Sequence, residues 1–196
     1  MTRLALADVA GHGESVAHVS EWLLEALRTH RDKADGEAVL EMLNASARQW
    51  GLEAMSTAVV VTVTPDGPTA TVAYAGHPPV LIYRRGRGAW DTVDNRRPRK
   101  GLNLTLGIFE NAEFTPRHLD LAAGDRLFAY TDGLLEAPHP ATGESYGLVQ
   151  LRESLGRHAA LPLSELKGAI LDDVSEWAGG NLTSDDVTLV AVEVGG

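Results

Sequence analysis

The middle of the chain constrains the fold most, because it holds several strand-like segments that follow one another directly. Residues 56–64 (STAVVVTVT) are rich in β-branched side chains, and Pro65-Asp66-Gly67 separates them from residues 69–75 as a hairpin turn would. Residues 80–84 and 89–93 continue the pattern around a glycine-containing turn. Paired parallel strands need a long crossover connection, usually a helix, between them. This region therefore predicts antiparallel sheet and not a doubly wound parallel sheet.

Helical patterns lie on both sides of these strands. Apolar residues recur at helical spacing over residues 14–30, 37–50, 148–158 and 163–177. Further strand-like segments cover residues 4–7, 106–110, 113–121, 126–131 and 187–194. Helices and strands that are segregated along a chain are typical of the α+β class. We therefore expect one α+β domain over residues 1–196, in which antiparallel sheets carry segregated helices.

The composition excludes several classes of protein. A chain of 196 residues that is 44% hydrophobic can bury one sizeable core. Because it has no cysteine, it forms no disulfide, thiolate nucleophile or cysteine-based zinc site, so a metal would need oxygen or imidazole ligands. The formal net charge of −10 argues against a nucleic-acid-binding surface. The start resembles no signal peptide and no apolar run is long enough for a membrane span, so we expect a cytoplasmic protein.

Aspartates occupy three strand ends. Asp8 ends the first apolar run, Asp132 ends the strand-like segment 126–131, and Asp185-Asp186 directly precedes the last one. Carboxylates that are brought together disfavour one another's ionisation, and divalent cations remove that cost. Mg²⁺ and Mn²⁺ prefer such oxygen ligands and can activate water beside a phosphate. Gly133 lets the backbone turn sharply after Asp132, which would hold this carboxylate at the rim of a rigid scaffold, where a metal or substrate could meet it. The alternative is that each aspartate merely starts a turn or caps a helix.

Five short motifs carry a resemblance to a known family. They are Asp8-Val9-Ala10-Gly11-His12-Gly13, Ala75-Gly76-His77-Pro78-Pro79, Leu106-Gly107-Ile108-Phe109, Tyr130-Thr131-Asp132-Gly133-Leu134-Leu135-Glu136 and Asp185-Asp186-Val187-Thr188. In order and approximate spacing they resemble the bacterial PPM-type (protein phosphatase 2C-like) serine/threonine phosphatases. The chain looks most like the stage II sporulation protein E-like branch. The resemblance implies an αββα sandwich of two antiparallel sheets flanked by helices.

The resemblance also implies a metal site and a reaction. Family members bind two Mn²⁺ or Mg²⁺ ions and hydrolyse phosphoserine or phosphothreonine with a metal-bound water. By this likeness Asp8 would bridge the metals, the carbonyl of Val9 would be a further ligand, and Asp132 and Asp185 would complete the protein ligands. Asp186 would be a neighbour or a water-mediated ligand. The branch acts on phosphorylated anti-sigma-factor antagonists, so the implied partner is a regulatory phosphoprotein.

One departure from the family pattern concerns the N-terminus. Relatives begin earlier, with a strand and a Gly-Gly-Asp-type motif whose acidic residue belongs to the metal site, whereas here nothing precedes Met1. The resemblance therefore implies a shortened domain that lacks one strand and one acidic ligand. An open strand edge would invite pairing with another chain, as in a homodimer. Besides a phosphatase, this leaves open a catalytically weak or inactive module that binds a regulatory partner, or a hydrolase of small phosphate esters.

Two histidines lie in the motifs. His12 sits in a glycine-flanked loop beside Asp8, and in eukaryotic members of the superfamily a nearby histidine is a proposed general acid. The offset of His12 from the aspartate differs from theirs, so a catalytic role and a loop-shaping role both stay open. His77 lies in a Gly-His-Pro-Pro turn, where the prolines fix the backbone, and we expect it to be structural.

Two other groups of residues have alternative interpretations. The basic residues Arg96, Arg97, Arg99 and Lys100 form a cluster before Gly101. They could steer a phosphorylated acidic partner towards the site, or simply form a solvated loop. The tryptophans Trp22, Trp50 and Trp177 lie on apolar helix faces, which predicts that they pack in the core.

Overall fold

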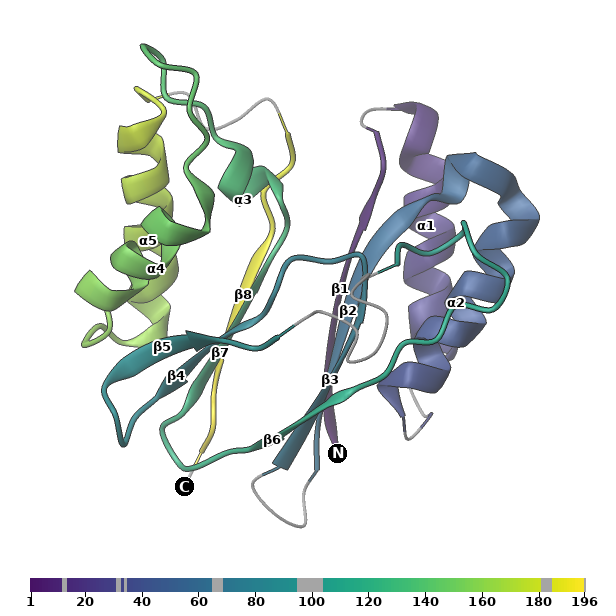
Figure 1. Ribbon diagram of the computed structural model, residues 1–196, viewed down its shortest axis with the longest axis horizontal. Coiled ribbons are helices and arrows are strands. Elements are labelled where there is room, and N and C mark those ends of the chain that lie inside the picture. The colour runs from purple at the N-terminus through teal and green to yellow at the C-terminus, as the bar shows by residue number, and fades with distance from the viewer. Residues whose placement is uncertain are drawn as a thin grey trace. The chain divides into compact units, whose positions relative to one another are not determined.

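The computed structural model describes residues 1–11, 14–30, 33, 35–64, 69–94, 104–180 and 185–195 (Figure 1). The chain forms two compact units. Unit 1 comprises Met1–His77 and Asp94–Leu121, and unit 2 comprises Pro78–Val93 and Ala122–Gly196. Each unit contains a four-stranded antiparallel sheet and its own helices. The expectation that they form a single domain stays a prediction.

The sheet of unit 1 has the strand order β1-β2-β3-β6. Its strands are β1 (Thr2–Val9), β2 (Ser56–Val63), β3 (Thr69–Ala75) and β6 (Arg117–Asp120). The β-branched side chains of β2 favour the extended backbone, and this central strand pairs along its whole length with β1. In that register Asp8 lies opposite Thr57 and Val9 lies opposite Ser56. The end of β1 is therefore fixed against the start of β2.

Two helices cover one face of this sheet, as Figure 1 shows. They are α1 (Glu14–Thr29) and α2 (Gly36–Trp50), and the 3-10 helix η1 (Gly51–Ala54) follows α2. Leu40 and Leu43 of α2 are fully buried in a cluster with Val60 of β2. Burial of such side chains contributes about 1.5–3 kcal/mol each to folding. The apolar stripe read from the sequence thus packs α2 onto the sheet.

The sheet of unit 2 has the strand order β5-β4-β7-β8. Its elements are β4 (Leu81–Arg84), β5 (Ala89–Thr92), β7 (Arg126–Tyr130), α3 (Gly133–Glu136), α4 (Gly147–Arg157), α5 (Leu163–Trp177) and β8 (Leu189–Glu193). Phe128 and Tyr130 of β7 are buried with Leu151 and Leu155 of α4 and Ile170 of α5. This core holds the C-terminal end of β7, where Asp132 follows, on a rigid support.

Most predicted elements are confirmed, and the predicted fold class is confirmed as α+β with two antiparallel sheets flanked by helices. The strand predicted over residues 106–110 is wrong. Leu106 makes one isolated bridge to Ser56, and the chain then turns at Gly107, whose φ is +86°. Asn44 explains the turn, because its side chain accepts from the Gly107 amide at 2.9 Å and donates to the Phe109 carbonyl at 2.8 Å. The two hydrogen bonds from the Asn44 side chain thus take the place of the bonds that a neighbouring strand would make to this backbone.

Three other predictions need comment. The segment predicted at 113–121 is extended in a sheet only over β6, and the turn at 65–67 lies outside the described residues. Core packing is wrong for Trp50, which is 44% exposed. As the last residue of α2 it contacts Trp22 of α1 instead, with ring centroids 5.9 Å apart and the rings tilted by 41°. Within the described residues, no helix is both long and apolar enough to cross a membrane.

Asp125 is a buried carboxylate that ties the start of β7 to the end of β4. It accepts hydrogen bonds from the Arg85 amide at 2.9 Å, from Arg84 Nη1 at 2.9 Å and from the Ala122 amide at 3.1 Å. Burial alone raises the pKa of this carboxyl, but the hydrogen bonds from Arg85, Arg84 and Ala122 outweigh it and lower the pKa below its ordinary value. Such a group stabilises the fold above its unfolded pKa, and that contribution is lost as the pH falls through the folded pKa.

We expect Asp125→Asn to lower the free energy of unfolding by about 2–3 kcal/mol near neutral pH, because an amide N–H would face one of these donors. The difference from the parent protein should shrink as the pH falls below about 3.9, the ordinary aspartate value, because the unfolded parent then binds a proton at Asp125 more readily than the folded parent does. Urea unfolding followed at several pH values measures both effects. The exposed Asp172 of α5, changed to Asn, is the matched control. A difference that does not vary with pH would contradict this account.

Candidate metal centre

Asp132 occupies the C-terminal end of β7 and starts the short helix α3. Its carbonyl accepts from the amides of Leu135 at 2.7 Å and Glu136 at 3.0 Å, so the backbone of Asp132 is fixed by the first turn. Its side chain is half-buried, and Oδ1 is buried without a hydrogen-bond partner among the described residues. Leaving a buried carboxylate oxygen unsatisfied costs about 1–3 kcal/mol or more. A bound cation would offset that cost.

The antiparallel pairing of β7 with β8 brings Asp185 and Asp186 to the same edge of the sheet. Tyr130 lies opposite Leu189, so the residues just beyond β7 meet those just before β8. Thr131 joins the two segments: its amide donates to the Thr188 carbonyl at 3.0 Å, and its hydroxyl donates to the Asp186 carbonyl at 3.2 Å. The Thr188 amide donates to the same hydroxyl at 2.9 Å. Thr131 therefore positions the segment that carries the two aspartates.

Gly133 lies directly against this aspartate segment. A Cβ atom on Gly133 would stand 2.6 Å from the Asp186 carbonyl oxygen and 3.5 Å from the Asp185 Cβ. The backbone does turn here, because the Leu134 amide donates to the Thr131 carbonyl at 3.2 Å, but Gly133 does not use the left-handed φ that favours glycine. Glycine is required at position 133 because the backbone of Asp186 lies too close to leave room for a side chain. Asp132 and Asp185–Asp186 thus belong to one compact corner of unit 2.

Asp8 and Val9 belong to unit 1, where they end β1. Directly opposite residues in an antiparallel pair share a face, so the side chains of Asp8 and Thr57 project to the same side. The Thr57 hydroxyl lies 2.9 Å from Nδ1 of His77, which is 1% exposed. His77 therefore fixes the residue beside Asp8, in agreement with the structural role expected for it. That Asp8 and Val9 share a metal with the aspartates of unit 2 stays a prediction.

Other predicted site residues are not placed. His12 and the basic cluster of Arg96, Arg97, Arg99 and Lys100 lie outside the described residues, as does the loop before Asp185. Within the described ranges, no three His, Asp or Glu side chains form a group that could hold a metal ion. The donors placed in unit 2, Asp132, Asp185 and Asp186, are carboxylates, which is the ligand type that Mg²⁺ and Mn²⁺ prefer. The buried, unsatisfied oxygen of Asp132 fits such a cation.

The sequence did not single out Thr131 or the spatial role of Gly133. Thr131 stands in the motif Tyr130-Thr131-Asp132-Gly133, and a hydroxyl residue between a buried strand and an aspartate is the available signal. Its importance depends on Thr188, which lies 57 residues away. Only the pairing of β7 with β8 shows that the two threonines meet.

This chain is similar to a known protein family, to curated relatives and to solved structures. Residues 1–195 match the family model for stage II sporulation protein E (SpoIIE). The phosphoserine phosphatase RsbP of Bacillus subtilis is 26% identical over 199 residues, which cover 97% of this chain and 45% of RsbP. The chain spans less than half the length of the curated relatives it matches.

Solved structures resemble the whole chain. The SiaA-PP2C domain of Pseudomonas aeruginosa superposes with a TM-score of 0.83 at 21% identity, covering 97% of this chain and 75% of that one. The structure of the RsbU and RsbW domains of Rv1364c from Mycobacterium tuberculosis gives a TM-score of 0.81 at 27% identity, covering 97% of this chain and 51% of that one. The fold is that of PP2C phosphatase domains.

Proposed function

Because the chain belongs to the stage II sporulation protein E (SpoIIE) family, we propose that it is a Mn²⁺- or Mg²⁺-dependent protein phosphatase. This family of PP2C-type phosphatases is related to the RsbU and RsbP regulators. The proposed substrate is a phosphoserine or phosphothreonine on a regulatory protein of the anti-sigma-factor antagonist type. The match to RsbP covers 97% of this chain and supports the reaction class.

The observation that carries the proposal is the unsatisfied carboxylate oxygen of Asp132 at a corner shared with Asp185 and Asp186. We assign Asp132 and Asp185 as protein ligands, with Asp8 and the carbonyl of Val9 completing the set and Asp186 as a neighbour. When bound, the cations would supply the positive charge that activates water and stabilises phosphate oxygens. Thr131 and Gly133 hold the aspartate segment in place.

The reaction needs no covalent enzyme intermediate. The oxygen of a water molecule forms a bond to phosphorus, the phosphorus–oxygen bond to the serine or threonine breaks, and the leaving oxygen takes a proton. The chain has no cysteine to serve as a thiolate nucleophile. We propose His12 as the acid that donates this proton.

A phosphatase assay with three metal conditions tests the function. A phosphoserine peptide and an aryl phosphate are incubated with Mn²⁺, with Mg²⁺ and with EDTA, and released phosphate is measured. We expect turnover of the peptide that EDTA abolishes and excess Mn²⁺ restores. Turnover of the aryl phosphate alone would identify a hydrolase of small phosphate esters instead.

The rival function is a weak or inactive phosphatase-like module that binds a regulatory partner. It differs from the proposed function in one measurable respect, since such a module would release no phosphate under any metal condition. A phosphorylated antagonist protein that is retained by the chain but not dephosphorylated would overturn the proposed activity. Thermal unfolding with and without Mn²⁺ shows independently whether the metal centre forms.

A further inference from the structure

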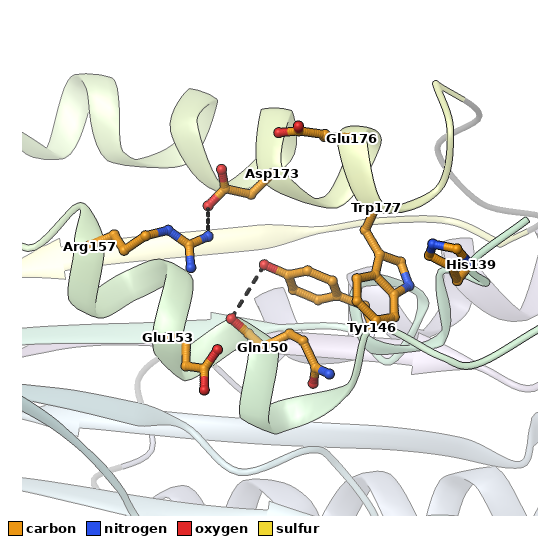
Figure 2. A pocket seen from close by; sticks show the side chains of 8 residues that line it. All are labelled: His139, Tyr146, Gln150, Glu153, Arg157, Asp173, Glu176 and Trp177. Carbon is orange, nitrogen blue, oxygen red and sulfur yellow. Dashed lines mark hydrogen bonds and ion pairs between the residues drawn. The ribbon is translucent and has the colours of Figure 1, made fainter. Parts of the chain in front are cut away.

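A pocket of about 320 Å³ opens between α4 and α5 of unit 2. Figure 2 shows side chains from both helices and from the loop before α4 around one space. Its size is at the lower end of the range for small-molecule sites. None of the aspartates assigned to the metal centre lines it. The pocket therefore needs an explanation of its own.

Three aromatic rings form one end of the pocket. The Trp177 ring meets His139 at a centroid distance of 5.1 Å and Tyr146 at 5.8 Å, at interplanar angles of 74° and 77°. The Trp177 indole N–H donates to the Glu144 carbonyl at 3.3 Å, and His139 Nδ1 accepts from the Ala141 amide at 3.3 Å. These contacts fix the rings before a ligand arrives. The face of an indole attracts cations.

The rest of the pocket carries excess negative charge. Its lining includes the carboxylates of Glu153, Asp173 and Glu176 against the single guanidinium of Arg157. Asp173 is already compensated, since it accepts from Arg157 at 2.7 Å, from His158 at 3.1 Å and from the Ser154 hydroxyl. Glu153 and Glu176 form no salt bridge within the part of the chain that the structure describes. They are available to pair with an incoming cation.

We propose that this pocket binds a basic side chain, lysine or arginine, of a protein partner. The aliphatic stem would pack along the ring of Trp177, because Tyr146 is only 3% exposed, and the charged head would reach the exposed carboxylates of Glu153 and Glu176 at the rim. A phosphate or carboxylate ligand would meet repulsion from the same two glutamates. The proposal does not depend on the chain's being a phosphatase, because none of these residues belongs to the metal centre.

A titration followed by NMR tests the proposal on the full chain labelled with ¹⁵N. The probes are N-acetyl-arginine methylamide, N-acetyl-lysine methylamide and the uncharged N-acetyl-norleucine methylamide. We expect saturable shifts of the Trp177 indole signal, assigned with Trp177→Phe, for the two basic probes, with a Kd on the order of 1 mM. The norleucine probe should cause no saturable shift. Equal binding of all three would overturn the proposal.

Charge variants give the second readout. The double variant Glu153→Gln/Glu176→Gln should weaken binding of the basic probes about tenfold, since it removes two ion pairs at the rim. Glu165→Gln, at an exposed position of α5 outside the pocket, is the matched control and should leave binding unchanged. Unchanged affinity in the double variant would overturn the proposal. Tighter binding of free L-arginine than of the blocked form would contradict a residue within a polypeptide as the ligand.

Discussion

Replacing Asp132 by Asn is expected to reduce phosphatase turnover by more than about 100-fold, because changes to residues that merely support a metal ligand already cost 10–100-fold. Asn keeps the shape of the side chain but removes the charge that would hold the cation. The buried, unsatisfied Oδ1 of Asp132 is the atom on which this expectation rests. Released phosphate from a phosphoserine peptide in Mn²⁺ measures the effect.

Stability provides a readout that does not depend on activity. With EDTA present, we expect Asp132→Asn to unfold at the same temperature as the parent protein or a higher one, because it removes a partly buried charge whose Oδ1 has no hydrogen-bond partner among the described residues. With Mn²⁺ at about 100 times its Kd, the parent should gain about 2.7 kcal/mol of stability. The variant should gain far less.

The control for this variant is Asp172→Asn, an aspartate exposed on α5. It should change neither turnover nor the stabilisation by Mn²⁺. If Asp132→Asn lost turnover but kept the full stabilisation by Mn²⁺, Asp132 would act in catalysis without holding the metal. If it kept both, the assignment of Asp132 would be wrong.

The fold could be predicted from the sequence where local pattern and tertiary structure agree. The β-branched run that becomes β2 and the apolar stripe of α2 each specify one structure, and both form as expected. The segment 106–110 fails because Asn44, which is 65 residues from Phe109, supplies hydrogen bonds that compete with a ladder. The strand propensity of a segment depends on its own residues and therefore does not include a hydrogen-bond partner so far away along the chain.

The candidate site was predictable in its residue types but not in its geometry. Strand ends and an acidic pattern single out Asp132 and Asp185, and the structure brings their segments together in unit 2. The reason for Gly133 could not be read from the sequence, because an Asp-Gly pair usually signals a turn. The close approach to Asp186 depends on the register between β7 and β8, which no local pattern specifies.

Gly133→Ala should therefore be damaging although alanine is a better helix former than glycine. The new Cβ would stand 2.6 Å from the carbonyl oxygen of Asp186, a backbone atom that cannot swing away as the end of a side chain can. We expect the free energy of unfolding to fall by about 1–3 kcal/mol, which is typical of overpacking. Because the displaced segment carries Asp185, the affinity for Mn²⁺ should also fall, by about 10–100-fold.

Gly168→Ala separates this steric effect from helix propensity. Gly168 lies within α5, and a Cβ there would meet no atom within 4 Å. Alanine should stabilise the protein at this position by up to about 1 kcal/mol and leave Mn²⁺ affinity and turnover unchanged. Calorimetric titration of Mn²⁺, at a temperature where both variants are folded, compares them directly. If Gly133→Ala stabilised the protein as Gly168→Ala does, the close approach of Gly133 to Asp186 could not be what holds the aspartate segment in place.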